Sequence, residues 1–200
     1  MNILGVILAR KGSKGIKNKN HLKLNGKSLI NIAIKNAKKS KRISKLIFST
    51  DDKILRDEAI KLGVSSPFLR PKKLASDKAS SFSVLKHSIE WLKDNENWQT
   101  DIVVLLQPTT PFRTGNLIDK VIKLMIDTKA DASLTITDVD YPPHWMMYKK
   151  GNKLKNIIKN GNKYTRRQDT PKAYKPAGMV YVIKKKLLYK AKGILPQGKT

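Results

Sequence analysis

The chain contains no cysteine, which excludes disulfide bonds and thiolate metal sites. It also lacks any apolar run near the roughly 20 residues that a membrane-spanning helix needs. The first apolar run, residues 3–9, is too short for the core of a signal peptide, and basic residues follow it instead of preceding it. Because 200 residues suffice for one domain with a real core, we expect a single cytoplasmic domain with no membrane segment.

Acidic residues are missing from the first quarter of the chain. Residues 1–50 hold thirteen Lys and Arg and no acid, residues 51–140 hold thirteen bases and fourteen acids, and residues 141–200 hold sixteen bases and one acid. The net charge of +27 therefore belongs to the two ends, where it suits nucleic acid, an anionic membrane or a small polyanion. A lysine-biased composition is the plainer alternative, since 35 of the 42 bases are Lys, and the scarcity of Arg weakens the case for nucleic acid.

Short apolar runs alternate with longer amphipathic segments along the chain. The runs predict strands at 3–9, 45–49, 102–106, 132–137 and 179–183. Helical spacing of apolar residues predicts helices at 28–39, 51–62, 80–93, 115–128 and 185–192. Asp51 is the expected cap of the second helix, and 65–79 is expected to be a loop. This alternation favours an α/β fold with a parallel or mostly parallel sheet covered on both faces.

Residues 139–177 interrupt this alternation. The segment is polar, rich in lysine and irregular in its hydrophobic pattern. It predicts an excursion from the core, either a small subdomain that serves as a dimerisation arm or a long surface loop.

A basic, glycine-containing loop follows the first predicted strand. In α/β sheets, ligands bind outside the carboxyl ends of the strands, so this loop lies where a ligand is expected. Its backbone can approach a ligand closely at Gly12 and Gly15, and phosphate is the natural guest of its cations. Those cations are Arg10, Lys11, Lys14, Lys17 and Lys19. Two known phosphate loops are excluded, because neither GxxxxGK(S/T) nor GxGxxG occurs, and a chance surface loop remains the alternative.

The same loop, LARKGSKGIKNKN at 8–20, resembles the amino-terminal signature of the nonulosonate (sialic acid type) cytidylyltransferases, L-A-R-x-x-S-K-G-(I/L)-x-x-K-N. Four further stretches resemble family motifs in the same order along nearly the whole chain. They are FSTDD at 48–52, FLRPKKLASDKASS at 68–81, LLQPTTPFRT at 105–114 and RRQDTPKAY at 166–174. The related 3-deoxy-manno-octulosonate enzymes carry a different first loop, so the resemblance favours the sialic branch.

The resemblance implies a Rossmann-like α/β fold of the nucleotide-diphospho-sugar transferase type, in one nucleotidyltransferase domain over 1–200. It implies a homodimer whose arm, about 139–177, crosses to the partner. It also implies the reaction of CTP with a nonulosonic acid to give CMP-sugar and pyrophosphate with Mg²⁺, in the synthesis of cell-surface polysaccharide. Neither nucleic acid nor a membrane is an expected partner.

The family's functional residues carry over to matching positions of this sequence. By resemblance, Arg10, Lys14 and Lys19 would hold the triphosphate, and Arg10, Lys19 and Gln107 would take part in catalysis. Ser13, Asn20, Arg70 and Ser81 would contact the nucleotide, and Gln107, Thr109, Thr110 and Arg167 would lie at the sugar acid or, for Arg167, the phosphates. Plainer roles remain open: Asp51 and Asp52 as helix caps only, Arg70 as the partner of an acid, and Gln107 as a partner of backbone groups.

The sequence departs from the family pattern in two places. The Asn-Gly that precedes the last strand in the family is Ala177-Gly178 here. The family's closely spaced aspartates, which bind magnesium after a Gly-Lys-Thr-like stretch, have no counterpart, because no acid follows Asp169. We therefore expect no metal ligands within this chain, a domain that is incomplete at its carboxyl end, and weak or absent catalysis.

Two rival functions remain at this point. One is a nucleotidyltransferase for a different acid sugar, or a glycosyltransferase, on the same fold. Against a glycosyltransferase, Gln107 stands where many such enzymes carry an acidic motif. The other rival is a non-catalytic basic protein that binds nucleic acid, but no basic stripe rich in aromatic residues supports it.

Overall fold

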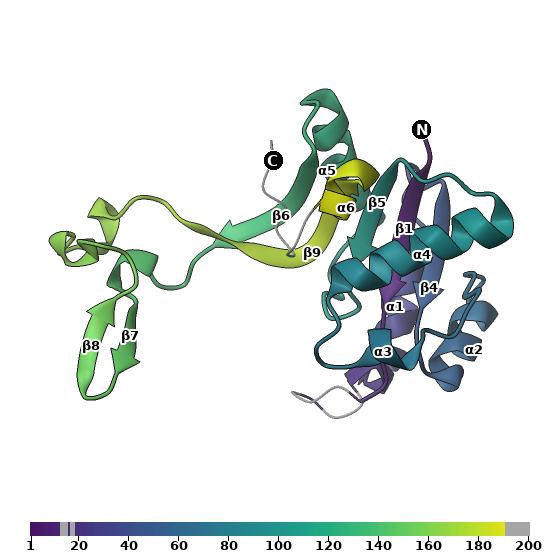
Figure 1. Ribbon diagram of the computed structural model, residues 1–200, viewed down its shortest axis with the longest axis horizontal. Coiled ribbons are helices and arrows are strands. Elements are labelled where there is room, and N and C mark those ends of the chain that lie inside the picture. Colours follow the sequence, from purple (N-terminus) through teal and green to yellow (C-terminus); the bar gives the residue numbers. More distant parts are fainter. Residues whose placement is uncertain (13–15, 17–18, 191–200) are drawn as a thin grey trace. The chain divides into compact units, whose positions relative to one another are not determined.

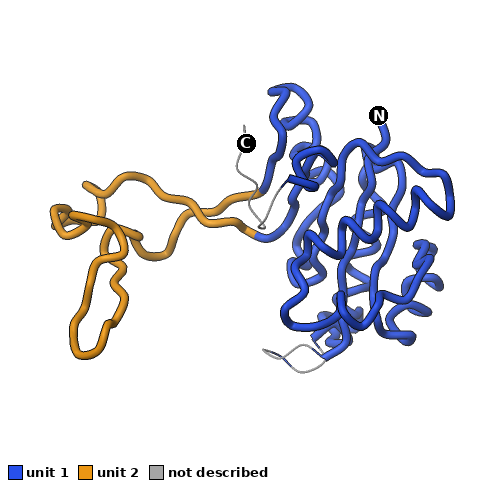
Figure 2. Tube along the Cα trace, viewed as in Figure 1, with its two compact units in different colours: residues 1–134, 178–200 blue, residues 135–177 orange. Residues whose placement is uncertain are grey.

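The computed structural model describes residues 1–12, 16 and 19–190. The chain divides into two compact units, residues 1–134 with 178–200, and residues 135–177 (Figure 2). Each unit is described by itself. Among the described helices, none combines the length and the apolar character that crossing a membrane requires.

The first unit is built on a five-stranded sheet in the order β4-β1-β5-β9-β6 (Figure 1). The strands are β1 (Ile3–Leu8), β4 (Lys45–Ser49), β5 (Ile102–Leu106), β6 (Ala132–Asp138) and β9 (Tyr174–Lys184). β1 lies parallel to both β4 and β5, with Val6 opposite Ile47 on one side and Leu105 on the other. β9 runs antiparallel to β5, so the sheet is mixed and the predicted α/β class is confirmed.

Helices cover both faces of this sheet because the strands are apolar on both faces. One buried cluster joins Ile3 and Ile7 of β1 to α1 (Leu29–Ala37), α2 (Lys53–Lys61) and α5 (Gly115–Asp127). A second cluster joins Leu4 and Val6, which point to the opposite face, to α4 (Ser81–Glu96) and α6 (Lys185–Lys190). α4 lies across the strands in Figure 1, and its first turn points toward the carboxyl ends of the parallel strands.

Shorter elements complete the first unit. They are the 3₁₀ turn η1 (Lys19–His21), the hairpin strands β2 (Lys23–Leu24) and β3 (Lys27–Ser28), and the short helix α3 (Lys72–Ala75). Helix α3 lies inside the segment that the sequence predicted as a loop. Its four residues are too few to leave an apolar periodicity in the sequence.

The predicted cap of α2 was wrong by one residue. Asp52, not Asp51, accepts hydrogen bonds from the main-chain N–H groups of Ile54, at 2.9 Å, and Leu55, at 3.4 Å. Asp51 instead accepts a hydrogen bond from the main-chain N–H of Lys11 at 2.9 Å. Two adjacent carboxylates both satisfy the sequence rule for a helix cap, and only the backbone direction decides between them.

The second unit occupies 135–177, where the sequence predicted an excursion at 139–177. It contains the antiparallel hairpin β7 (Met147–Lys150) and β8 (Lys153–Asn156) and the 3₁₀ turns η2 (Pro143–Trp145), η3 (Gly161–Lys163) and η4 (Arg167–Asp169). The indole N–H of Trp145 donates to the carbonyl of Tyr164 at 2.7 Å. A Cβ at Gly161 would lie 1.9 Å from the carbonyl oxygen of His144, so this close packing requires glycine.

Candidate functional site

A cavity of about 370 Å³ opens at the carboxyl ends of β1 and β5. This volume is within the range of small-molecule sites, and the location is where parallel α/β sheets bind ligands. The lining residues are Leu8, Arg10, Lys19, Asn20, Arg70, Leu74, Ser76, Asp77, Ala79, Ser81, Val84, Gln107, Pro108 and Thr109.

Positive charge dominates this lining. Arg10, Lys19 and Arg70 contribute three cations, and Asp77 contributes one carboxylate. The Nη1 atom of Arg10 lies 2.6 Å from Oδ1 of Asp77, in an ion pair whose side chains are 33% and 42% exposed. The excess of cations makes the cavity suitable for a ligand with several negative charges.

Arg70 is the most deeply buried of the three cations, with 6% of its surface exposed. Its guanidinium donates to the carbonyl of Ser49, the last residue of β4, and to that of Ala9, which directly follows β1. It also donates to the hydroxyl of Ser49 at 3.2 Å. Burial lowers the pKa of Arg70 to about 10, although the nearby Asp51 carboxylate partly offsets this effect. The side chain therefore fastens the ends of two strands and still reaches the cavity.

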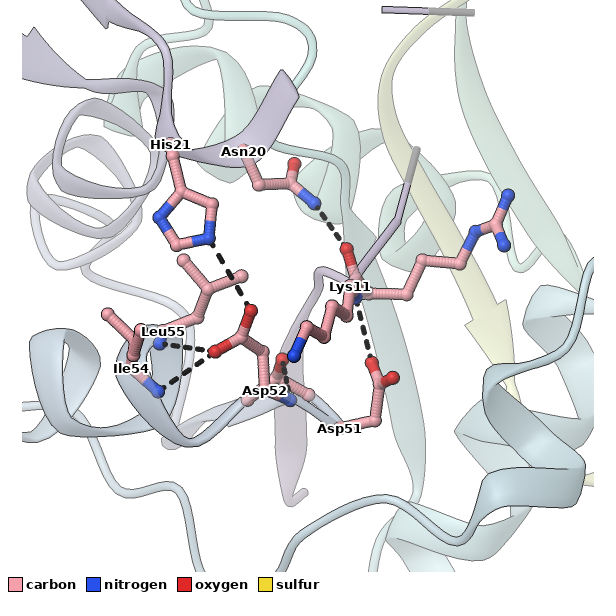
Figure 3. Close-up of polar contacts among 9 residues, drawn as sticks. Lys11, Asn20, His21, Asp51, Asp52, Ile54 and Leu55 are labelled. Carbon is pink, nitrogen blue, oxygen red and sulfur yellow. Dashed lines mark hydrogen bonds and ion pairs between the residues drawn. The ribbon is translucent and has the colours of Figure 1, made fainter. Parts of the chain in front are cut away.

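Asn20 fixes the segment that carries Lys19. Its side chain is 5% exposed and donates from Nδ2 to the carbonyl of Arg10 at 3.0 Å (Figure 3). The main-chain N–H of Leu22 also donates to the carbonyl of Lys19 at 3.1 Å, which closes the turn. These bonds place Lys19 and Arg10 on the same cavity although they are nine positions apart in the sequence.

The amino terminus of α4 forms another part of the wall. Ser80 caps the helix by accepting a hydrogen bond from the N–H of Ser83 at 3.1 Å, and Ser81 and Val84 line the cavity. The first N–H groups of a helix carry partial positive charge, which adds to the attraction for an anion.

The turn after β5 supplies Gln107 and Thr109. The hydroxyl of Thr110 donates to the carbonyl of Gln107 at 3.0 Å, which closes the turn behind them. Gly178 of β9 lies against this turn, and a Cβ there would lie 3.7 Å from Oε1 of Gln107. The φ angle of Gly178 is +74°, a backbone conformation that glycine adopts without strain. The residue before it is Ala177, where the family has Asn.

Arg113 was quoted within a motif, but the sequence reasoning gave it no role. Its side chain is 1% exposed, and Nη1 donates to the carbonyls of Gln107 and Met179, both at 2.9 Å. Burial lowers its pKa to about 10. Arg113 thus ties the Gln107 turn to β9. The signal for this role was its place at the end of LLQPTTPFR, where a bulky cation follows a buried strand and two prolines.

The cavity brings together most of the predicted site residues that the structure describes. Those that line it are Arg10, Lys19, Asn20, Arg70, Ser81, Gln107 and Thr109. Thr110 stands just behind the lining, as described above. Arg167 belongs to the second unit, where it begins η4 and lines a hollow of that unit together with Asp138 and Thr170. Ser13 and Lys14 lie outside the described residues.

Carboxylates are sparse around this cavity. Within the described part of the chain, no group of three or more His, Asp or Glu side chains could hold a metal ion.

Known proteins resemble this chain along most of its length. A family described as "Cytidylyltransferase" matches residues 4–199. The chain is 33% identical over 181 residues to pseudaminic acid cytidylyltransferase of Campylobacter jejuni, covering 90% of this chain and 78% of that protein. It is 41% identical over 122 residues to N-acylneuraminate cytidylyltransferase of Escherichia coli, covering 61% of this chain and 28% of that protein.

The fold agrees with a solved structure of CMP:2-keto-3-deoxy-manno-octonic acid synthetase complexed with CTP. The TM-score is 0.69 at 17% identity, over 95% of this chain and 77% of that one. The family match, the identity to nonulosonic acid enzymes and the shared fold lead to one conclusion: this chain belongs to the cytidylyltransferase family, in its nonulosonate branch.

Proposed function

We propose that this chain transfers the cytidylyl group of CTP to a nonulosonic acid and releases pyrophosphate. The observation that carries the proposal is the single cavity on which Arg10, Lys19, Arg70, Ser81 and Gln107 converge from five separate parts of the sequence. Family membership indicates the nucleotide, and the relatives named above act on acid sugars of this class.

The proposed reaction is a displacement at the α-phosphorus of CTP. The anomeric hydroxyl oxygen of the sugar acid forms the new P–O bond, the bond to the bridging α,β-oxygen breaks, and the hydroxyl proton passes to solvent. Negative charge builds on the phosphate oxygens and on the leaving pyrophosphate. Arg10 and Lys19 would stabilise this charge, and loss of one such contact typically raises a barrier by about 2–4 kcal/mol. Positioning of the two substrates supplies the remainder, since no covalent enzyme intermediate is needed.

Nucleotide and sugar would occupy opposite sides of the cavity. Asn20, Arg70 and Ser81 would lie around the cytosine and ribose, since they come from η1, the segment before α3, and the start of α4. Gln107 and Thr109, at the end of β5, would face the sugar acid, with Thr110 behind them.

A homodimer is the second part of the proposal, with unit 135–177 as its arm. Large apolar side chains of this unit are exposed, among them Met147, Leu154 and Ile157. A second copy of the chain would cover them, and Arg167 would then meet the carboxylate of the sugar acid or the phosphates. Analytical ultracentrifugation checks this part: a monomer at micromolar concentration would contradict it.

Magnesium enters the proposal as the companion of CTP, whose phosphate oxygens are its natural ligands. No step of the reaction is assigned to it.

Pyrophosphate release is the direct test. The protein is incubated with Mg²⁺, each of CTP, UTP, ATP and GTP, and in turn pseudaminic, N-acetylneuraminic and legionaminic acid. 3-Deoxy-manno-octulosonic acid serves as the matched acid sugar from outside the class. We expect release that requires CTP and one of the nine-carbon acids. Release with another nucleotide, or only with the octulosonic acid, would contradict the assignment, as would salt-sensitive DNA binding without any release.

A further inference from the structure

Four residues at the end of β4, Ser49–Asp52, form what we call the β4–α2 junction. The first two residues of the junction, Ser49 and Thr50, both accept hydrogen bonds from Arg70, and Thr50 also accepts one from Asp52. The carbonyl of Ser49 accepts from the Arg70 guanidinium, the carbonyl of Thr50 accepts from the Arg70 main-chain N–H at 2.7 Å, and the Thr50 hydroxyl accepts from the N–H of Asp52 at 3.1 Å. The junction therefore supports one wall of the cavity before its carboxylates are considered.

Asp51 reaches from this junction to the segment after β1. Its Oδ1 accepts a hydrogen bond from the main-chain N–H of Lys11 at 2.9 Å (Figure 3). Lys11 directly follows Arg10, so this bond fixes the peptide that leads away from a cavity-lining cation. The negative charge of the same carboxylate raises the pKa of Arg70 and partly offsets the effect of burial.

Asp52 makes the second connection, to the turn η1. Its Oδ1 caps α2, while its Oδ2 lies 3.4 Å from Nε2 of His21. Figure 3 shows the two neighbouring carboxylates turned apart, Asp51 toward Lys11 and Asp52 toward His21 and the helix. Since Asp52 alone supplies the side-chain cap, capping does not account for Asp51.

The two connected segments are also bound to each other. Asn20 donates from its side chain to the carbonyl of Arg10 at 3.0 Å. Three polar contacts therefore connect the junction to Lys11, the junction to His21, and Asn20 to Arg10. Arg10 and Lys19 lie in or directly beside the residues that make these contacts, so the contacts fix the main chain that carries both cations.

We propose that Asp51 and Asp52 are positioning residues that set the main chain of Arg10–Lys11 and of Lys19–His21 for binding the triphosphate of CTP. This inference rests on the proposed function for the identity of the ligand. Asp51 carries the greater part, because its hydrogen bond at 2.9 Å goes directly to the main chain that follows Arg10. The carboxylate of Asp52 acts through its contact with His21 in η1 and through its hydrogen bonds to the first turn of α2.

The first test compares steady-state kinetics of Asp51→Ala with those of Asp51→Asn. Alanine removes the acceptor, whereas asparagine keeps an oxygen at the same distance from the backbone. We expect Asp51→Ala to raise KM for CTP at least fivefold and to change KM for the sugar acid less than twofold, and we expect Asp51→Asn to restore most of the CTP affinity. Equal changes in both KM values, or an Asn variant as impaired as the Ala variant, would overturn the proposal.

Asp119 offers a matched control. Its carboxylate also binds a neighbouring loop, accepting from the N–H groups of Lys41 at 2.9 Å and Arg42 at 3.1 Å, and it does not line the cavity among the residues described. Asp119→Ala should lower Tm and leave KM for CTP within twofold of the wild-type value. A rise in KM equal to that of Asp51→Ala would show that loop destabilisation in general, and not this junction, affects the nucleotide.

Amide hydrogen exchange tests the hydrogen bond between Asp51 and Lys11 without any nucleotide. In the free protein, Asp51→Ala should speed exchange at Lys11 at least tenfold, while Asp119→Ala should not. Unchanged exchange at Lys11 would refute the hydrogen bond between Asp51 and Lys11. If the wild-type protein released no pyrophosphate with CTP but the exchange result held, the proposed function would fail and the positioning geometry would stand.

Discussion

Asp77→Asn should tighten the binding of CTP and pyrophosphate. The Asp77 carboxylate holds Arg10 in an ion pair at 2.6 Å inside the cavity. A triphosphate that recruits Arg10 must break this pair. Because both side chains are about one-third or more exposed, the pair is worth roughly 0.2–1 kcal/mol, as in other solvent-exposed pairs. Removing it should therefore lower Kd by a factor of about 1.4 to 5.

Isothermal titration calorimetry with CTP, and separately with pyrophosphate, measures this change. The gain should shrink in 0.5 M salt, because salt weakens ion pairs between solvent-exposed side chains. Asp127→Asn is the control, since it removes the same charge from an exposed ion pair with Lys123 on α5, which does not line the cavity among the described residues. Unchanged or weaker binding by Asp77→Asn would refute the reasoning and would mean that the carboxylate contributes to the bound state.

The other predictions concern single residues of the site and its support. Arg10→Ala or Lys19→Ala should lower turnover at least tenfold while the circular dichroism spectrum and Tm stay near wild type, because each removes transition-state charge stabilisation and little packing; wild-type rates would refute these two assignments. Arg113→Lys should destabilise the protein by about 1–3 kcal/mol in urea titrations, since the lysine side chain is one bond shorter and its ammonium falls short of the carbonyls that Nη1 reaches. Gly178→Ala should cost about 1–2 kcal/mol through its left-handed backbone, with no steric clash, and a neutral effect would contradict the φ of +74°. Burial, and secondarily a nearby carboxylate, raises the pKa of the Tyr189 phenol to about 12, so the unfolded chain ionises it first and stability should fall between pH 10 and 12; Tyr189→Phe should remove part of that fall.

The sequence alone predicted most of the sheet and its helices. β1 and β5 are continuous apolar runs with both faces buried, and β4 has an apolar centre at 46–48. α1, α4 and α5 carry an apolar stripe, so period and length were sufficient signals. β9 was predicted only over 179–183, although it spans Tyr174–Lys184. Its first residues are exposed and polar, and strand pairing through the backbone leaves no hydrophobic signal there.

The sequence motifs also predicted most of the site residues that line the cavity, because short stretches at the ends of strands carry the chemistry in this fold. The sequence could not assign Asp51 and Asp52 to different tasks. Both residues are the same acid at adjacent positions, and only the turn between β4 and α2 aims one at Lys11 and the other at His21.

By itself, the sequence determined the fold class, the family and the identity of the groups that are proposed to bind phosphate, since these depend on residue type and local period. The tertiary structure decided which of those groups share a cavity and what holds them there. Arg10, Arg70 and Gln107 are far apart along the chain and converge only because β1, β4 and β5 are paired side by side. The orientation of Arg70 rests on hydrogen bonds to the main-chain carbonyls of Ala9 and Ser49, and every residue carries such carbonyls, so these bonds leave no mark in the sequence.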